Sequence, residues 1–232
     1  MKRAALGVLL AALSAGIAFA GRPLATDDAG TVEPGRFETE LSFDYCRNRP
    51  DGACQTVGVQ LKHGLTGRMD IGLAFGHGTD KDADGNTVGW GMSPLSIGLK
   101  MALLKGHRFL PNLSLAAAFE TGEREYLING IASREIAGIG LHFNLGYEST
   151  GEKLVRGEYI TGLAMEYTFL KKLRVCAELN SELLDDGKHV IGNSGLIGGS
   201  IDLGFGCLDA GGRLFDHRGP SWEAVTGLTF AF

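Results

Sequence analysis

Residues 36–45 read RFETELSFDY, and this stretch decides the fold. Its large apolar and aromatic residues stand at odd positions, and its charged residues stand at even positions. The odd-position set is Phe37, Leu41, Phe43 and Tyr45. Successive side chains of a β-strand point to opposite faces, so a period of two predicts a strand with one apolar face and one polar face.

The same odd-position phase recurs in TVGVQLKH (56–63), RMDIGLAFG (68–76) and PLSIGLKMA (94–102). Similar segments continue to the end of the chain, and each has about 9–11 residues, the length of a tilted strand that crosses a membrane. After residue 20, no run approaches the roughly 18 apolar residues that a spanning helix needs. If the chain is in a membrane, we expect it to cross as strands.

Counting the alternating segments predicts twelve strands. They lie near 36–46, 54–63, 67–77, 92–102, 111–121, 125–133, 138–148, 157–168, 172–182, 194–203, 206–215 and 222–232. Alternation is weak in the sixth, tenth and eleventh, so ten strands is the alternative count. Short turns alternate with longer loops rich in Gly, Asp and Asn, which predicts an all-β, antiparallel, up-and-down transmembrane β-barrel. A soluble β-sandwich is disfavoured, because its strands would show more hydrophilic outward faces.

The first twenty residues have the layout of a secretory signal peptide. Lys2 and Arg3 form a basic start, an apolar stretch follows over 4–13, and Ala18-Phe19-Ala20 matches an A-x-A cleavage site. We therefore predict a cleaved signal peptide over 1–20, a periplasmic N-terminal segment over 21–35, and a barrel in the outer membrane of a Gram-negative bacterium over 36–232.

Composition narrows the choice of partners. The chain has 27 acidic and 22 basic residues and a formal charge of -5, which becomes -7 once Lys2 and Arg3 are removed. This balance argues against nucleic acid, which requires a basic surface. Glycine, at 36 of 232 residues, is about twice as common as average and falls inside the strand-like segments, where it marks bends and bulges.

The last predicted strand, WEAVTGLTFAF, ends at Phe232. Trp222, Leu228, Phe230 and Phe232 share one face, and aromatic residues at both ends of a strand match the two interfacial girdles of membrane barrels. This ending resembles the C-terminal signal that the outer-membrane assembly machinery reads. Outer-membrane lipid and the barrel-assembly machinery are therefore the expected partners.

The stretch GRPLATDDAGTVEPGRFETELSF (21–43) resembles the opening of the MetA-pathway of phenol degradation family, a group of outer-membrane barrels described as transporters. HGLTGRMDIGLAFG (63–76) and FLKKLRVCAELN (169–180) are similar to that family's pattern of a short turn feeding a strand. The resemblance implies a barrel of about this strand number, passage of small molecules, aromatic ones included, and no catalytic residues. The four cysteines and short outer loops depart from the family pattern.

Two pairs of cysteines invite comparison. Cys46 and Cys54 flank a seven-residue loop at even positions, so their side chains should point the same way across a hairpin mouth. We predict a disulfide between them in an oxidising compartment. Cys176 and Cys207 fall two strands apart, about 9.5 Å, which disfavours a bond because bridged Cα atoms lie within roughly 7 Å.

Acidic residues cluster before the first strand. Asp27, Asp28 and Glu33 are interpreted either as part of a plug or gate that folds into the lumen and meets Lys62, Arg174 or Arg213, or as part of a tether that holds the first strand in register. The alternation also predicts a set of lumen-lining side chains. These are Glu38, Glu40, Lys62, Asp70, Lys100, His142, Glu166, Arg174 and Glu178. Buried charges must pair or meet water, so we expect networks around the basic members.

Other constellations are weaker. Asp80, Asp82 and Asp84 have the spacing of a calcium loop, but Gly91 stands where the bidentate glutamate belongs, so a solvated surface loop is the preferred interpretation and no metal is predicted. His142 has no serine at i+2 on its strand, and Ser194 lacks the G-x-S-x-G elbow. We expect no enzyme activity and no cofactor. Two functions stay open: a channel for small solutes of unknown identity, and a non-conducting structural or surface-interaction barrel.

Overall fold

The alternating segments form thirteen β-strands in the computed structural model, which describes residues 22–48, 52–107, 109–122, 125–149, 156–169, 172–186, 189–216 and 220–232. The strands are β1 (Phe37–Asn48), β2 (Ala53–Thr66), β3 (Met69–Lys81), β4 (Thr87–Met92), β5 (Ser96–Leu104), β6 (Asn112–Glu120), β7 (Tyr126–Ile136), β8 (Ile139–Ser149), β9 (Glu158–Phe169), β10 (Leu173–Leu184), β11 (Val190–Asp202), β12 (Cys207–Phe215) and β13 (Pro220–Ala231). The predicted signal peptide lies outside the described residues.

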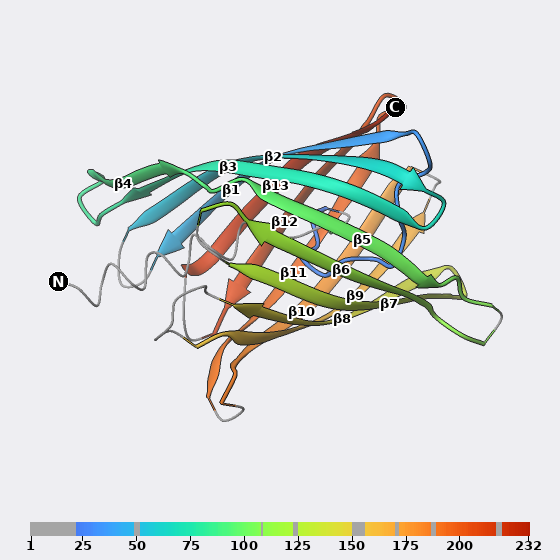
Figure 1. Ribbon diagram of the computed structural model, residues 1–232. Helices are drawn as coiled ribbons and strands as arrows, with labels where there is room; N and C mark the ends of the chain where they lie inside the picture. Colours follow the sequence, from blue (N-terminus) through green and yellow to red (C-terminus); the bar gives the residue numbers. More distant parts are fainter. Residues whose placement is uncertain are drawn as a thin grey trace.

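The strands pair antiparallel with their sequence neighbours, except that β5 pairs with β3 instead of β4. The first strand, β1, also pairs with β13, which closes the sheet into a barrel (Figure 1). The strand β3 pairs with β4 through His77–Lys81 and with β5 through Met69–Ala74. Both β4 and β5 therefore occupy one position in the wall. The described strands thus form the predicted twelve-strand antiparallel barrel with one additional strand.

The additional strand corrects the sequence-based boundaries. Residues 78–91, which the predicted strands 67–77 and 92–102 leave as a loop, form the end of β3 and most of β4, a hairpin that projects past the rim in Figure 1. The interruption falls at Pro94, whose nitrogen cannot donate to the ladder. Ser93 compensates with two bonds, since its backbone N–H donates to the Gly76 carbonyl and its hydroxyl accepts from the Gly76 N–H.

Large apolar side chains cover the outside of the barrel. Odd-numbered residues such as Leu41, Leu73, Leu99 and Leu163 are exposed, as expected for side chains that meet lipid. Aromatic rings border this band at both ends, with Phe37 stacked on Phe232 and Tyr45 against Trp222. Tyr45 is eight residues after Phe37, so the two girdles lie about 20 Å apart at the usual strand rise and tilt.

The two ends of the barrel differ. We call the end that holds the short β2–β3, β7–β8, β9–β10 and β11–β12 connections the turn end, and the opposite end the loop end. At the turn end, the backbones of Phe37 and Phe232 exchange two hydrogen bonds, so β1 and the end of the chain meet there. No described residues form a helix that is long and apolar enough to span a bilayer.

The predicted disulfide is confirmed. Cys46 and Cys54 lie directly opposite each other on β1 and β2, with Cα atoms 5.0 Å apart, and are bonded. Cys176 on β10 and Cys207 on β12 are free thiols, and β11 separates their strands. The bond therefore joins the two strands at the loop end, next to the point where the ladder stops.

Candidate functional site

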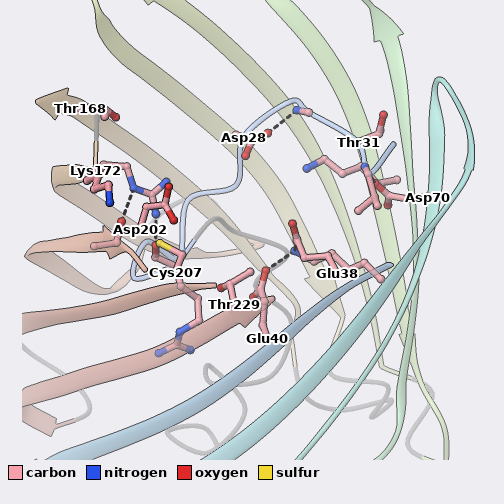
Figure 2. Close-up of a pocket in the computed structure, with 17 residues that line it drawn as sticks. Asp28, Thr31, Glu38, Glu40, Asp70, Thr168, Lys172, Asp202, Cys207 and Thr229 are labelled. Atoms are coloured by element: carbon pink, nitrogen blue, oxygen red, sulfur yellow. Dashed lines mark hydrogen bonds and ion pairs between the residues drawn. The ribbon is translucent and has the colours of Figure 1, made fainter. Parts of the chain in front are cut away.

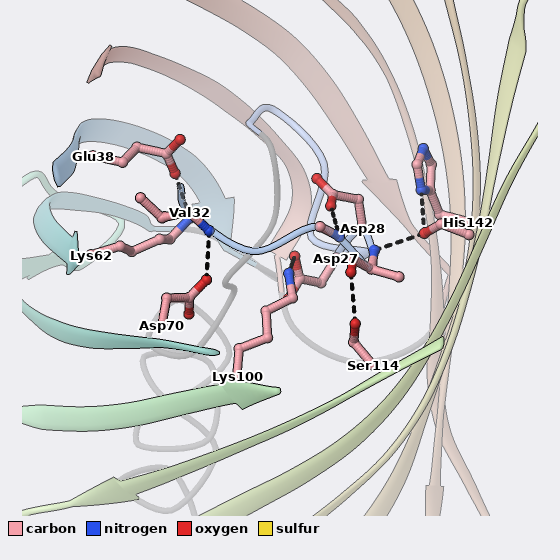
Figure 3. A network of polar contacts seen from close by, with 12 residues as sticks. Asp27, Asp28, Val32, Glu38, Lys62, Asp70, Lys100, Ser114 and His142 are labelled. Atoms are coloured by element: carbon pink, nitrogen blue, oxygen red, sulfur yellow. Dashed lines mark hydrogen bonds and ion pairs between the residues drawn. The ribbon is translucent and has the colours of Figure 1, made fainter. Parts of the chain in front are cut away.

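Residues 22–34, here called the lumen segment, cross the inside of the barrel before β1 begins (Figure 3). Pro34 forms an isolated bridge with Gly64, and the Gly35 N–H donates to the Gly64 carbonyl at 2.8 Å. These contacts fix the point where the segment leaves the lumen at the turn end. The rest of the segment contacts strands on several sides of the barrel.

Arg22 anchors the start of the described segment to one side of the wall. Its guanidinium lies 3.2 Å from the Asp44 carboxylate and 3.4 Å from that of Asp209, and donates to the Thr226 carbonyl at 2.9 Å. The Arg22 carbonyl accepts a hydrogen bond from Arg174. Charge-assisted bonds of this kind are the stronger class in proteins, so Arg22 ties the segment to β1, β10, β12 and β13.

The middle of the segment binds charged side chains across the lumen. The Thr26 N–H donates to the Glu178 carboxylate at 2.5 Å, and Lys100 Nζ lies 2.9 Å from Asp27 Oδ1. Both Asp27 and Lys100 are buried. Burial raises the pKa of the Asp27 carboxyl to about 7, because the desolvation cost exceeds the attraction of Lys100.

The last part of the segment uses its backbone. The Ala29 N–H donates to Ser133 Oγ at 2.8 Å, and its carbonyl accepts from Ser114 at 2.6 Å. The Val32 N–H then donates to Asp70 Oδ2 at 2.9 Å (Figure 3). An irregular segment inside a barrel needs such partners, because its own backbone forms no ladder there.

Glycines in the wall make room for the segment. A Cβ atom on Gly162 would lie 2.5 Å from Thr26 Oγ1, and one on Gly198 would lie 2.8 Å from Pro23 Cγ. Gly227 and Gly64 are likewise too close to Arg22 and to the Glu33 carbonyl to carry a side chain. Part of the glycine excess therefore serves close approach of the lumen segment, a role that the sequence alone did not assign to particular positions.

The nine predicted lumen-lining residues all lie on the inner face, and most are buried. Lys62 lies 3.0 Å from Glu38 and 2.6 Å from Glu40. Arg174 pairs with Glu166 at 3.0 Å, and Glu178 pairs with Arg213 at 3.2 Å. Two of the expected networks, around Lys62 and Arg174, are therefore present, while contact of these residues with a solute stays a prediction.

The three acidic residues of the N-terminal segment have different surroundings. Asp27 reaches the lumen, but its ion-pair partner is Lys100 and not one of the three cations expected from the sequence. Asp28 is half-buried and faces a cavity, whereas Glu33 is exposed at the turn end. Arg174 contacts the segment at the Arg22 carbonyl and not at the three acidic residues.

A serine joins His142 from the neighbouring strand, which the search within one strand missed. Ser133 and His142 are paired residues on β7 and β8, with Oγ 2.9 Å from Nδ1, and Glu166 Oε1 lies 3.6 Å from Nε2. Cross-strand register could have indicated the pair. Ser133 is buried and engaged by Ala29, and none of the three residues lines the cavity, so the group acts here as an anchor for the segment.

Asp80, Asp82 and Asp84 lie in the hairpin formed by β3 and β4. Asp82 Oδ1 accepts from the Asp84 and Asn86 N–H groups at 3.0 and 2.9 Å, which closes a local turn. Across the described ranges, no three or more His, Cys, Asp or Glu side chains are arranged to hold a metal ion. Asp82 therefore stabilises the turn of this hairpin through its carboxylate.

Carboxylates gather inside the loop end. Glu148 and Glu158 are directly paired on β8 and β9, and Glu148 also interacts electrostatically with Glu120, Glu125 and Glu182. These five side chains come from neighbouring parts of the wall between β6 and β10. The loop end of the lumen is therefore rich in acidic groups.

At the turn end, the lumen segment and the wall enclose a cavity of about 450 Å³ (Figure 2). Most of its lining residues are polar or charged, and they include both acidic and basic side chains, among them Arg22, Asp28, Asp70, Lys172 and Asp202. The free thiol Cys207 also lies on this cavity.

The comparisons with known proteins support the fold. No family model and no curated protein matches the chain. Among solved structures, an outer membrane channel from Pseudomonas putida F1 matches with a TM-score of 0.65 and 9% identity over 88% of this chain and 98% of that one. LpxR from Salmonella typhimurium matches with a TM-score of 0.51 and 10% identity over 82% of this chain and 99% of that one. The chain therefore has the fold of outer-membrane β-barrel proteins.

Proposed function

We propose that this protein is an outer-membrane channel for small solutes whose own lumen segment limits passage. The observation that carries the proposal is the arrangement of the lumen. A segment held by contacts with charged side chains crosses it, and a cavity of about 450 Å³ remains beside the segment. Similarity in fold to an outer membrane channel, and the resemblance to the phenol-degradation family, support the proposal.

The charge of the lumen points to the preferred solutes. Five carboxylates interact at the loop end, and rings of carboxylates favour cations over anions through their local potential. Cationic or neutral polar solutes should therefore enter more readily than a phenolate. The preference for cations can be measured as a reversal potential under a salt gradient.

Location and assembly belong to this proposal. The apolar outer band and its two aromatic girdles support insertion into a bilayer. Cleavage after Ala20, export and insertion through the terminal strand ending at Phe232 complete the expected route.

Conductance and reversal potential in planar bilayers under a salt gradient test the proposal. At about pH 9, where the carboxyl groups of the loop end are ionised, we expect openings with cation preference, and a lower preference in a Glu148→Gln/Glu158→Gln variant. Glu135→Gln, at an exposed residue of the turn end, is the matched control and should leave selectivity unchanged. Absence of openings from folded protein, in wild type and in a variant lacking the lumen segment, would favour the alternative, a non-conducting structural or surface-interaction barrel.

A further inference from the structure

The cavity at the turn end has two walls of opposite charge. One wall carries Asp28, Glu38, Glu40 and Asp70 together with Lys62 and Lys100. The other carries Arg22, Lys172 and Arg174 together with Asp202. Counted as ordinary charges, the first wall has an excess of two negative charges and the second an excess of two positive charges. Figure 2 shows Asp70 and Lys172 on opposite sides of the cavity.

The negative excess is concentrated on two side chains. Lys62 is engaged by Glu38 and Glu40, and Lys100 by Asp27, so neither lysine lies within ion-pair distance of Asp70 or Asp28. Asp70 is 2% exposed, and its Oδ2 accepts the Val32 N–H. Its Oδ1 is buried without a hydrogen-bond partner among the described residues. A buried carboxylate oxygen without a donor is costly, and a cationic ligand group would remove that cost.

The positive wall has one cation without an ion-pair partner among the described residues, Lys172. Arg22 and Arg174 are bound to carboxylates that do not line the cavity, Asp44, Asp209 and Glu166. The exposed Lys172 side chain has no ion pair with any residue in the part of the chain described. Thr168 lies on the same side of the cavity as Lys172 (Figure 2), whereas Thr229 is the register partner of Glu40 and belongs to the opposite wall. The Lys172 ammonium and the Thr168 hydroxyl can both donate to a carboxylate.

From these two walls we infer that the turn-end cavity binds small zwitterionic solutes, with the solute ammonium group at Asp70 and Asp28 and its carboxylate at Lys172. A cavity of about 450 Å³ is large enough for a small organic molecule. A solute with one charge would match one wall and gain nothing at the other, whereas a zwitterion matches both. The inference deepens the proposed function by naming a solute class, and it rests on that function only for the step of passage.

Isothermal titration calorimetry on the folded, detergent-solubilised protein tests the site. The probes are linear ω-amino acids with two to six methylene groups, and the n-alkylammonium and n-alkanoate ions of matching length. We expect at least one amino acid to bind tenfold more tightly than both of its single-charge counterparts. Equal or weaker binding across the whole series would overturn the inference.

Two substitutions locate the ligand. Asp70→Asn keeps an oxygen for the Val32 N–H but removes the charge, and Lys172→Gln removes the opposite charge; each should weaken the best amino acid at least fivefold. The matched controls are Asp84→Asn and Lys105→Gln, at residues that do not line the cavity, and they should leave binding unchanged. Unchanged affinity in both cavity variants would also overturn the inference. Binding without conductance would contradict the channel proposal and support the zwitterion site. Conductance without binding would support the channel proposal and contradict the site.

Discussion

Substitution of Gly162 by alanine should release the lumen segment from the wall. The new Cβ would lie 2.5 Å from Thr26 Oγ1 and 2.8 Å from Asn180 Oδ1, and no backbone atom is among its nearest neighbours. The barrel ladder can therefore stay intact while Thr26 moves, which weakens the bond from the Thr26 N–H to Glu178. Overpacking of this kind costs about 1–3 kcal/mol, roughly a 5- to 150-fold change in the docking equilibrium.

Cys176 provides the assay for this variant. Its thiol is 5% exposed and packs in a cluster with Leu24 of the lumen segment, so undocking exposes it to the lumen. The assay uses a Cys207→Ser background, in which Cys176 is the free thiol of the described chain. There, Gly162→Ala should raise the maleimide labelling rate by roughly 5- to 150-fold, the change expected in the docking equilibrium.

Two control variants separate docking from general damage. Gly212→Ala adds a Cβ with no heavy atom within 4 Å and should label at the wild-type rate. Thr26→Ala in the Gly162→Ala protein removes the clashing hydroxyl and should return labelling toward the wild-type rate. If Gly162→Ala folds and labels no faster than wild type, the segment is not held at Gly162 and the reasoning fails.

Three further predictions follow from other parts of the structure. Replacing Cys46 and Cys54 by alanine should lower the free energy of unfolding by only about 2.5 kcal/mol in the chain-entropy model and leave a folded, heat-modifiable barrel; failure to fold would contradict this. Leu99→Arg, on the outer face, should cost about 2–4 kcal/mol in lipid-vesicle unfolding, whereas Lys105→Arg, outside the strands, should cost almost nothing; equal effects would argue against a lipid-facing Leu99. Because the docked Asp27 has a pKa of about 7 instead of 3.8, docking takes up a proton and is favoured at acidic pH. In the Cys207→Ser background, raising the pH from 6 to 8 should therefore speed labelling of Cys176 more when Asp27 is present than in Asp27→Asn, which lacks this proton-linked contribution. Identical pH profiles would refute the assignment.

The barrel wall was predictable because its determinants are local. Alternation of apolar and polar residues sets which face meets lipid, and Cys46 and Cys54 could be paired by counting along one hairpin. The β4 hairpin was missed because its Gly- and Asp-rich sequence also fits a loop, and only pairing with the extended β3 makes it a strand.

The contacts of the lumen segment were beyond such reasoning. Lys100 and Asp27 are 73 residues apart, and Arg22 and Asp209 are 187 apart. Which inward side chains meet the segment depends on where it crosses a closed barrel, and alternation along a strand carries no information about that path. For the same reason, Gly162 could be recognised as a strand glycine but not as the position that admits Thr26.

Single-channel conductance of the mature barrel, compared with a variant that lacks residues 22–33, tests the central claim most directly. Heat-modifiable migration of both proteins establishes first that each is folded. We predict small or infrequent openings for the complete protein, and larger, sustained openings once the segment and its anchors at Asp44, Lys100 and Glu178 are separated. Equal conductance of the two proteins would contradict the claim that the segment limits passage, and silence from both would contradict the claim that the barrel is a channel.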